Sequence, residues 1–166
     1  MSGGHNFPND MTENNIKTLP SGLQYSRDFS EYDGCVVMHN AKTINRYREL
    51  QEEKSKQDCY RYDCFFAFSN QQFAEGLKKI RPLKEGEKLV SVGAGMYGTR
   101  DGVDKFFAAY DEIDKRIKQE CDPQEVYFYE YNNHESMISW DGDAEPFKII
   151  RRIWGDETAA KIVRLP

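Results

Sequence analysis

The chain has 166 residues, of which 39% are hydrophobic and 31% charged, and its net charge is −5. This composition indicates one soluble globular domain, and the acidic balance disfavours a general nucleic-acid binder. No apolar run approaches the roughly 18 residues that cross a bilayer, and the first residues lack the basic and apolar regions of a secretory signal. We therefore expect a cytoplasmic protein that does not enter membranes.

The first 20 residues are rich in Asn, Gly, Ser and Thr and have no apolar periodicity. We expect them to form a mobile arm, and residues 21–166 to form a single domain. A helix is predicted over about residues 36–56 because apolar side chains recur there on one stripe, namely Val37, Ala41, Ile44 and Tyr47.

The middle of the chain predicts two short strands and two helices. Residues 64–68 have the pattern of a buried strand, and Ser69 followed by Gln72 is a capping box that opens a helix. Residues 89–92 predict a second strand. From about Asp101 to Glu120, apolar residues recur at close to 3.6-residue spacing, which predicts the clearest helix of the chain.

The segment from 126 to 143 predicts a β-hairpin that is followed by a helix. Apolar and aromatic residues alternate over 126–131 and again over 136–140, with a four-residue polar loop between them. Asp143 is expected to cap the next helix, which Gly155 ends, and Asp156 to cap a last short one. The fold class predicted is α+β, with one mixed sheet of about four strands, a C-terminal antiparallel hairpin and helices packed on the sheet.

In this hairpin, Tyr127, Tyr129 and Tyr131 share the face opposite Val126 and Phe128. If no helix covers them, three tyrosines form an amphipathic platform that suits a protein partner or a stacked base. A helix lying over them is the alternative. The tyrosine face and the His134 loop are our candidate interaction site.

Acidic residues and one histidine crowd into the same region, and the weak catalytic candidates are His134, Glu135, Asp141 and Asp143. Oxygen ligands with one histidine suit Mg or Mn. A strand between Glu135 and Asp141 would hold them about 20 Å apart, at roughly 3.3 Å per residue. One ion cannot bind both groups, so we expect no metal and no cofactor, and the simpler role of Asp141 and Asp143 is a turn and a helix cap.

The sequence Gly93-Ala-Gly-Met-Tyr-Gly98 is formally a GxGxxG motif after a predicted strand. In dinucleotide-binding folds, such glycines let the backbone approach a pyrophosphate at a helix N-terminus. The acidic residues about 20 positions further on lie inside the long helix instead of ending a strand, which disfavours that function. Gly93, Gly95 and Gly98 remain a weak ligand-binding candidate, and the alternative is a glycine turn.

The four cysteines, Cys35, Cys59, Cys64 and Cys121, form no CxxC pair. A tetrahedral zinc knuckle is therefore poorly supported, and reduced structural thiols are expected. Ser136 and Ser139 do not lie in a nucleophile elbow, so no nucleophilic triad is indicated.

Three segments carry a resemblance: residues 64–76 with the pattern FAFSxxQFxEG, residues 89–95 with a strand that ends in glycines, and residues 129–135 with the sequence NHE at the end. Over about residues 35–145 the chain resembles an uncharacterised family of small proteins from gut bacteria, their phages and mobile elements. That family has no established activity, so the resemblance implies no catalytic residues. It implies an accessory or regulatory role, in phage–host conflict for example.

The first function that these patterns predict is a non-enzymatic cytoplasmic interaction or regulatory protein that binds a protein partner. If the partner is a second copy of the chain, the protein forms a homo-oligomer. The alternatives are a small metal-dependent hydrolase or nuclease that uses the region of His134 and Asp141, and a nucleotide or small-ligand sensor at the loop from Gly93 to Gly98.

Overall fold

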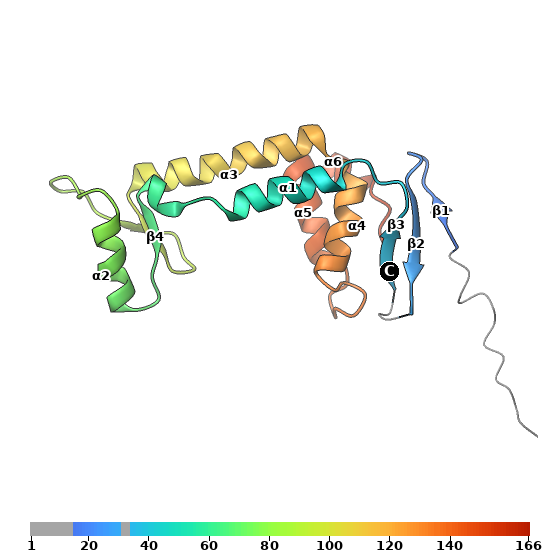
Figure 1. The fold of residues 1–166 in the computed structure, drawn as a ribbon, viewed down its shortest axis with the longest axis horizontal. Coiled ribbons are helices and arrows are strands. Elements are labelled where there is room, and N and C mark those ends of the chain that lie inside the picture. The colour runs from blue at the N-terminus through green and yellow to red at the C-terminus, as the bar shows by residue number, and fades with distance from the viewer. Residues whose placement is uncertain (1–14, 31–33) are drawn as a thin grey trace, which may run out of the picture. The chain divides into compact units, whose positions relative to one another are not determined.

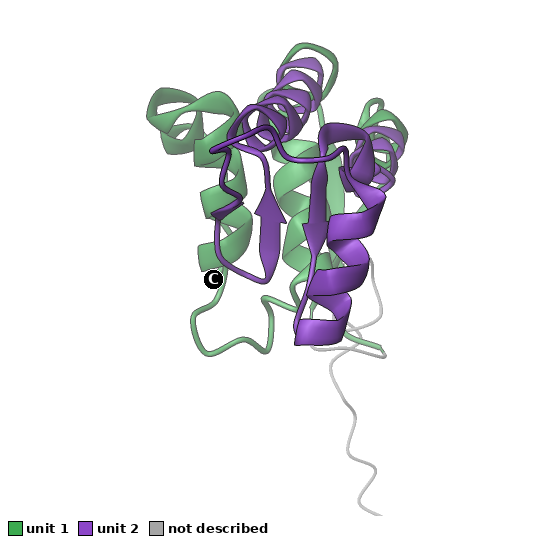
Figure 2. Cartoon of the chain, turned by 90° about the vertical axis from the view of Figure 1, so that its left-hand side faces the viewer, with its two compact units in different colours: residues 1–48, 117–166 green, residues 49–116 purple. Residues whose placement is uncertain are grey.

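A computed structural model of the protein describes residues 15–30 and 34–166. The chain divides into two compact units (Figure 2): unit 1 comprises residues 1–48 and 117–166, and unit 2 comprises residues 49–116. Helices α1 (Ile44–Ser55) and α3 (Arg100–Glu120) contribute residues to both units. The expected arm over residues 1–20 lies mostly outside the described residues, and the expectation of a single domain stays a prediction.

Unit 1 contains a three-stranded antiparallel sheet in the order β1 (Lys17–Thr18), β2 (Gln24–Asp28) and β3 (Cys35–Met38) (Figure 1). In β3, Val36 is buried whereas Val37 is 40% exposed, as strand alternation requires. The predicted helix over 36–56 is therefore wrong at its start, because these residues pair with β2 and α1 begins only at Ile44.

Three helices complete unit 1: α4 (Pro123–Asn133), α5 (Ala144–Trp154) and α6 (Asp156–Ala160). Helix α4 packs against β3 and against α5, and α6 packs against α5 (Figure 1). The ring of Phe128 on α4 lies 4.6 Å from the ring of Tyr25 on β2, measured between centroids. Gly155, with φ of +87°, ends α5 as predicted, whereas Asp143 makes no side-chain hydrogen bond as its cap.

Helix α4 replaces the first strand of the predicted hairpin, so that prediction is wrong. The helix begins with a complete start signal: Asp122 accepts a hydrogen bond from the Glu125 backbone N–H at 3.0 Å, and Pro123 occupies the first turn. Its side chains are buried on nearly every side, including Val126, Tyr127, Phe128, Glu130 and Tyr131. A helix buried all round shows no 3.6-residue stripe, which is why its sequence resembled a strand.

Unit 2 contains a second antiparallel sheet, in the order β4 (Cys64–Phe66), β6 (Met96–Gly98) and β5 (Val90–Ser91). The short 3₁₀ helix η2 (Cys59–Tyr62) precedes β4, and α2 (Asn70–Lys79) follows it. The predicted cap at Ser69 is confirmed at the start of α2, but the return bond of Gln72 reaches Phe68, the residue before the cap, instead of Ser69. Ser69 Oγ accepts from the Gln72 N–H at 3.2 Å, and Gln72 Oε1 accepts from the Phe68 N–H at 2.8 Å.

Side chains on the two faces of this sheet enter different hydrophobic clusters. On one face Cys64 and Met96 pack with Val103 and Phe106 of α3. On the other face Phe65 lies with Ala67 and Ile80, and its ring contacts Phe73 of α2 edge-on. The predicted strand at 64–68 and the helix over about 101–120 are thus confirmed in type, with ends that differ by one or two residues.

The architecture is α+β, as predicted, but the single mixed sheet of four strands is wrong. The described residues form two small antiparallel sheets of three strands each. Two of the expected strands belong to the second sheet, as β4 and β5, while its middle strand β6 was not expected. The expected closing hairpin is helix and turn. The first sheet escaped prediction because residues 24–28 are mostly polar and because residues 36–38 fit the apolar stripe of the predicted helix.

Candidate functional site

Helix α4 carries most of the side chains that the sequence singled out. Tyr127 and Tyr131 are buried, at 0% and 1% exposure, and Tyr129 is half-buried. They do not form an open platform. Tyr127 and Tyr131, one turn apart, share a buried face of the helix with their ring centroids 6.1 Å apart, and Tyr129 points away from them because two residues turn a helix by about 200°. The exposed tyrosine face is therefore absent from this structure.

His134 lies at the C-terminal end of α4, one helical turn beyond Glu130. Its Nε2 atom is 3.1 Å from Glu130 Oε2. Glu130 is 5% exposed, and its other oxygen accepts a hydrogen bond from the Tyr47 hydroxyl at 2.7 Å. A buried carboxylate thus orients a half-exposed imidazole, which is the arrangement of a histidine positioned for proton transfer or for a polar contact.

Of the other three catalytic candidates, Asp141 and Asp143 have side-chain partners of their own. Glu135 has a positive φ of 50° just after the helix ends, and Asp141 accepts a hydrogen bond from Ser139. Asp143 binds the Arg164 guanidinium through both oxygens, at 2.6 and 2.8 Å. Within residues 15–30 and 34–166, no group of three His, Cys, Asp or Glu side chains is arranged to hold a metal ion.

Asp143 is the centre of a buried polar network. Its Oδ2 atom accepts a hydrogen bond from the Tyr127 hydroxyl at 2.7 Å, in addition to the bond from Arg164. The Arg164 guanidinium holds the pKa of this carboxyl below its usual range. Burial, together with the bond to Asp143, raises the pKa of Tyr127. The predicted helix cap therefore serves instead as the anchor of a C-terminal arginine.

The loop from Glu135 to Asp143, between α4 and α5, exposes two large apolar side chains as well as the charged Glu135 and Asp141. Trp140 is 97% exposed and Ile138 is 64% exposed. Ile138 and Met137 also line a depression of about 160 Å³ with Cys35, Asn132 and Glu135. Exposed tryptophan at this level is uncommon in a folded domain and marks the loop as a candidate contact surface.

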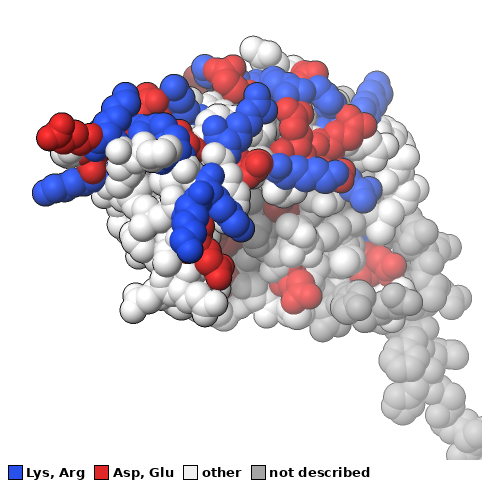
Figure 3. Space-filling view, turned by 60° about the vertical axis from the view of Figure 1, so that its left-hand side comes forward, with Lys and Arg blue, Asp and Glu red and all other residues white. Residues whose placement is uncertain are grey.

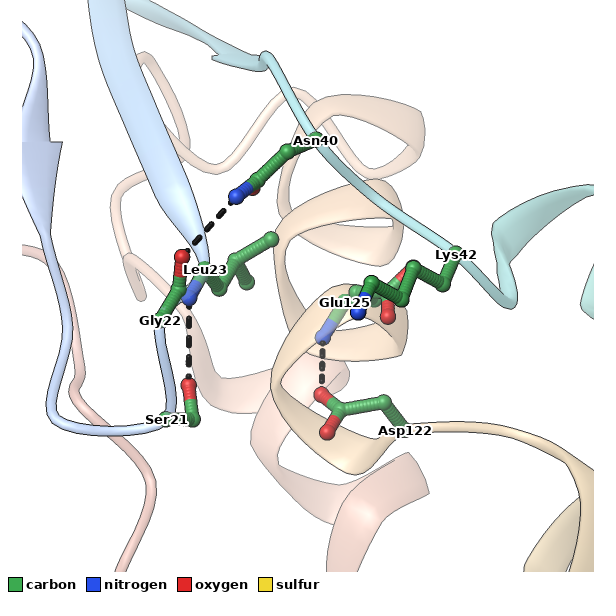
Figure 4. Close-up of a pocket in the computed structure, with 7 residues that line it drawn as sticks. All are labelled: Ser21, Gly22, Leu23, Asn40, Lys42, Asp122 and Glu125. Carbon is green, nitrogen blue, oxygen red and sulfur yellow. Dashed lines mark hydrogen bonds between the residues drawn. The ribbon is translucent and has the colours of Figure 1, made fainter.

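A second depression lies beside the N-terminus of α4 (Figure 4), with a volume of about 170 Å³. It is lined by Ser21, Gly22, Leu23, Asn40, Lys42, Asp122 and Glu125. Several of its polar groups are already paired within the protein, as Figure 4 shows for Asn40 with Gly22 and for Asp122 with Glu125. Both depressions are smaller than the roughly 300 Å³ of ordinary small-molecule sites, so neither is proposed as a small-molecule site.

The glycine motif has a different geometry from a phosphate-binding loop. Gly93, Ala94 and Gly95 all have positive φ and form the turn between β5 and β6, while Gly98 lies in β6. The Phe68 ring lies close over Gly95. A Cβ atom added to Gly95 would come within 2.5 Å of this ring. The glycines therefore make a hairpin turn and not a loop between a strand and a helix, although ligand binding at this position stays a prediction.

Charged side chains in unit 2 are largely paired with one another. Lys54 lies 3.0 Å from Asp114, and Arg116 lies 2.7 Å from Glu53. Acidic and basic side chains are interspersed on the face drawn in Figure 3. Such a face attracts neither anions nor cations strongly, and each exposed pair contributes at most about 1 kcal/mol.

Fold and site together define a small α+β protein whose most distinctive surface is the loop after His134. A model of the family of unknown function DUF7659 matches residues 46–145, and the chain belongs to this family. No curated protein and no solved structure matches it. In the part of the chain that the structure describes, no helix combines the length and apolarity needed to cross a membrane.

Several residues of these sites were missed from the sequence. The spacing of Glu130 and His134, one turn apart, would have indicated their contact once the segment was known to be helical. The start signal at Asp122 and Pro123 was available but was outweighed by the aromatic alternation. No local signal indicates the contacts of Tyr47 and Arg164, because their partners lie 83 and 21 positions away.

Proposed function

We propose that the protein is a non-enzymatic interaction protein that acts through the loop between α4 and α5. The observation that carries this proposal is the 97% exposure of Trp140. Tryptophan is enriched among the residues that dominate binding energy at protein interfaces, because a large apolar ring loses much water-exposed area in one contact. Ile138 extends the same apolar surface.

A second copy of the chain is the partner that this surface suits best. The loop carries both a projecting side chain, Trp140, and the apolar depression lined by Cys35, Met137 and Ile138. A two-fold contact joins the same patch of two copies, so a patch with both a projection and a recess can complement itself. The proposal therefore takes the form of a homodimer built on this loop.

The proposal also covers the biological source of the protein and its compartment. The resemblance of residues 35–145 favours a protein of gut bacteria, their phages or mobile elements, and we propose the cytoplasm as its compartment. A regulatory or accessory role by association with protein partners fits this setting.

Sedimentation velocity over a wide range of concentrations tests the proposal. We expect the wild-type chain to show a reversible dimer and Trp140→Ser to remain monomeric with unchanged circular dichroism. Phe68→Ser is the matched control, since Phe68 is an exposed aromatic residue of unit 2, at 77% exposure, and its loss should leave the dimer intact. A wild-type chain that stays monomeric throughout would contradict the proposal.

A hydrolase function at His134 is a second candidate, favoured by the hydrogen-bonded carboxylate of Glu130. Here the imidazole would act as a general base for water and Glu130 would position it. Activity toward nitrophenyl acetate or a nitrophenyl phosphodiester that disappears in His134→Gln but survives in Glu135→Gln would favour it. Equal activity of wild type and His134→Gln would count against it.

A further inference from the structure

The C-terminal segment Val163–Pro166, here called the tail, is held by side chains of α4. Gln124 Oε1 accepts from the Val163 N–H at 2.8 Å, and Gln124 Nε2 donates to the Val163 carbonyl at 3.1 Å. The Tyr127 hydroxyl accepts from the Leu165 N–H at 2.9 Å. These bonds are made to backbone atoms, so they recognise an extended chain whatever its side chains.

One side chain of the tail is recognised specifically. The Arg164 guanidinium bonds Asp143 through two nitrogens, at 2.6 and 2.8 Å, and lies 3.9 Å from the centroid of the Phe147 ring. A planar guanidinium can donate two parallel hydrogen bonds to a carboxylate and can stack its flat face on an aromatic ring. A lysine ammonium fits both arrangements less well. The site therefore selects arginine at this position.

The site is more deeply buried than the segment that occupies it. Gln124, Tyr127 and Asp143 are at most 8% exposed. In contrast, Val163 is 38% exposed and the side chain of Arg164 is 48% exposed. A short segment whose own residues are mostly exposed, and which is held by a few hydrogen bonds and one ion pair, is expected to open locally at a lower free-energy cost than the helices.

We infer that Gln124, Tyr127, Tyr131 and Asp143, here called the tail groove, form a binding site for an extended peptide that carries an arginine, and that the tail occupies it in cis. Tyr131 completes the groove by donating its hydroxyl to the Pro166 carbonyl at 3.0 Å. A partner protein that presents such a segment competes with the tail for the same bonds. This inference is independent of the Trp140 loop.

A direct test uses a fluorescent peptide with the sequence of residues 161–166, capped at both ends, and measures its anisotropy with the full chain. In the tail-release variant, Arg164→Ala with Leu165→Pro, the tail loses its ion pair and the N–H that bonds Tyr127. We expect this variant to bind the peptide at least about tenfold more tightly than wild type, because the apparent affinity scales with the fraction of open groove.

Two further variants assign the binding to the groove. Adding Asp143→Asn to the tail-release variant should abolish binding, and replacing arginine by lysine in the peptide should weaken it. Trp140→Ser should leave peptide binding unchanged, which separates this inference from the proposed homodimer. Peptide binding that is equal in wild type and tail-release variant, or that survives Asp143→Asn, would overturn the inference.

A further test uses only the wild-type chain, so it does not require any variant to fold. Excess unlabelled peptide should displace the tail and move the amide signals of Val163 and Leu165 toward free-chain shifts in NMR spectra, and unchanged signals at saturating peptide would refute the inference. A wild-type dimer that dissociates in the tail-release variant would show that the tail occupies the groove of a second copy, and would overturn a partner peptide as the ligand.

Discussion

Gln124 and Val163 are joined by a pair of hydrogen bonds between one side-chain amide and one backbone residue, at 2.8 and 3.1 Å. Asn132, two turns further along α4, makes the same pair with Val36 of β3, at 2.8 Å each. In both cases a carboxamide offers a donor and an acceptor side by side, which matches the N–H and C=O of an extended residue. Helix α4 thus fixes two extended segments by the same chemistry.

The two amides should differ in their effect on stability. Asn132→Ala removes the partner of the N–H and C=O of the buried residue Val36, so we expect a loss of about 1–3 kcal/mol in the free energy of unfolding, the usual cost of unpaired buried groups. Gln124→Ala releases only the tail, and we expect a smaller loss, with fast amide exchange confined to residues 163–166. Urea denaturation and hydrogen exchange check both values. Equal losses in the two variants would contradict this ranking.

The hydrogen bond from Tyr47 to Glu130 should stabilise unit 1. Tyr47→Phe removes a donor from a buried carboxylate, and bonds to charged groups contribute about 1.5–3 kcal/mol. Tyr129→Phe makes the same chemical change on α4 at a half-buried position and is the matched control, with an expected change within about 0.5 kcal/mol. Urea denaturation of both variants measures the difference, and an equal effect would mean that the bond contributes nothing.

Acid should weaken the contact between Asp143 and Arg164. The folded-state pKa of Asp143 is depressed by this partner, so its contribution to stability is present above the unfolded value of about 3.9 and is lost as the pH falls through the folded value. We expect the free energy of unfolding to fall more steeply below about pH 4 in wild type than in Asp143→Asn. Parallel pH profiles of the two proteins would contradict the assignment.

Gly102→Ala should destabilise unit 2, contrary to helix propensity. Alanine in place of glycine usually stabilises a helix by about 0.8–1 kcal/mol. Here a Cβ would approach the Tyr62 carbonyl oxygen to 1.9 Å, and a backbone atom cannot move aside cheaply. We expect a net loss of about 1–3 kcal/mol, measured by thermal or urea unfolding. Asp104→Ala, exposed in the same helix, is the control and should have little effect.

The four cysteines should react with a thiol reagent at very different rates. Burial raises the pKa of Cys64 and of Cys121 to about 11, so their reactive thiolates are scarce at neutral pH. Cys35 and Cys59 are both half-buried, but burial raises the pKa of the Cys59 thiol, so Cys35 should be modified first in the folded protein. Mass spectrometry after brief treatment with iodoacetamide identifies the modified residue. Early labelling of Cys64 or Cys121 would show that these positions open more readily than their burial indicates.

The fold was predictable wherever local interactions decide the structure. The cap at Ser69 needs only Gln72, three residues away, and the long apolar stripe of α3 faces one side of a single helix. The candidate site was less predictable. The sequence marked His134 and the segment around it, but it did not show that Glu130 orients His134 or that Trp140 is exposed.

By itself, the sequence determined helices α2 and α3 and strands β4 and β5 of unit 2. It also determined the crowding of polar and aromatic residues between 126 and 143. The tertiary structure decided whether that segment was strand or helix. Tyr127 and Tyr131 are enclosed by α4's neighbours and the tail, through bonds to Asp143, Leu165 and Pro166. A helix that buries all its faces owes its stability to partners distant in sequence, and no periodicity along the chain records them.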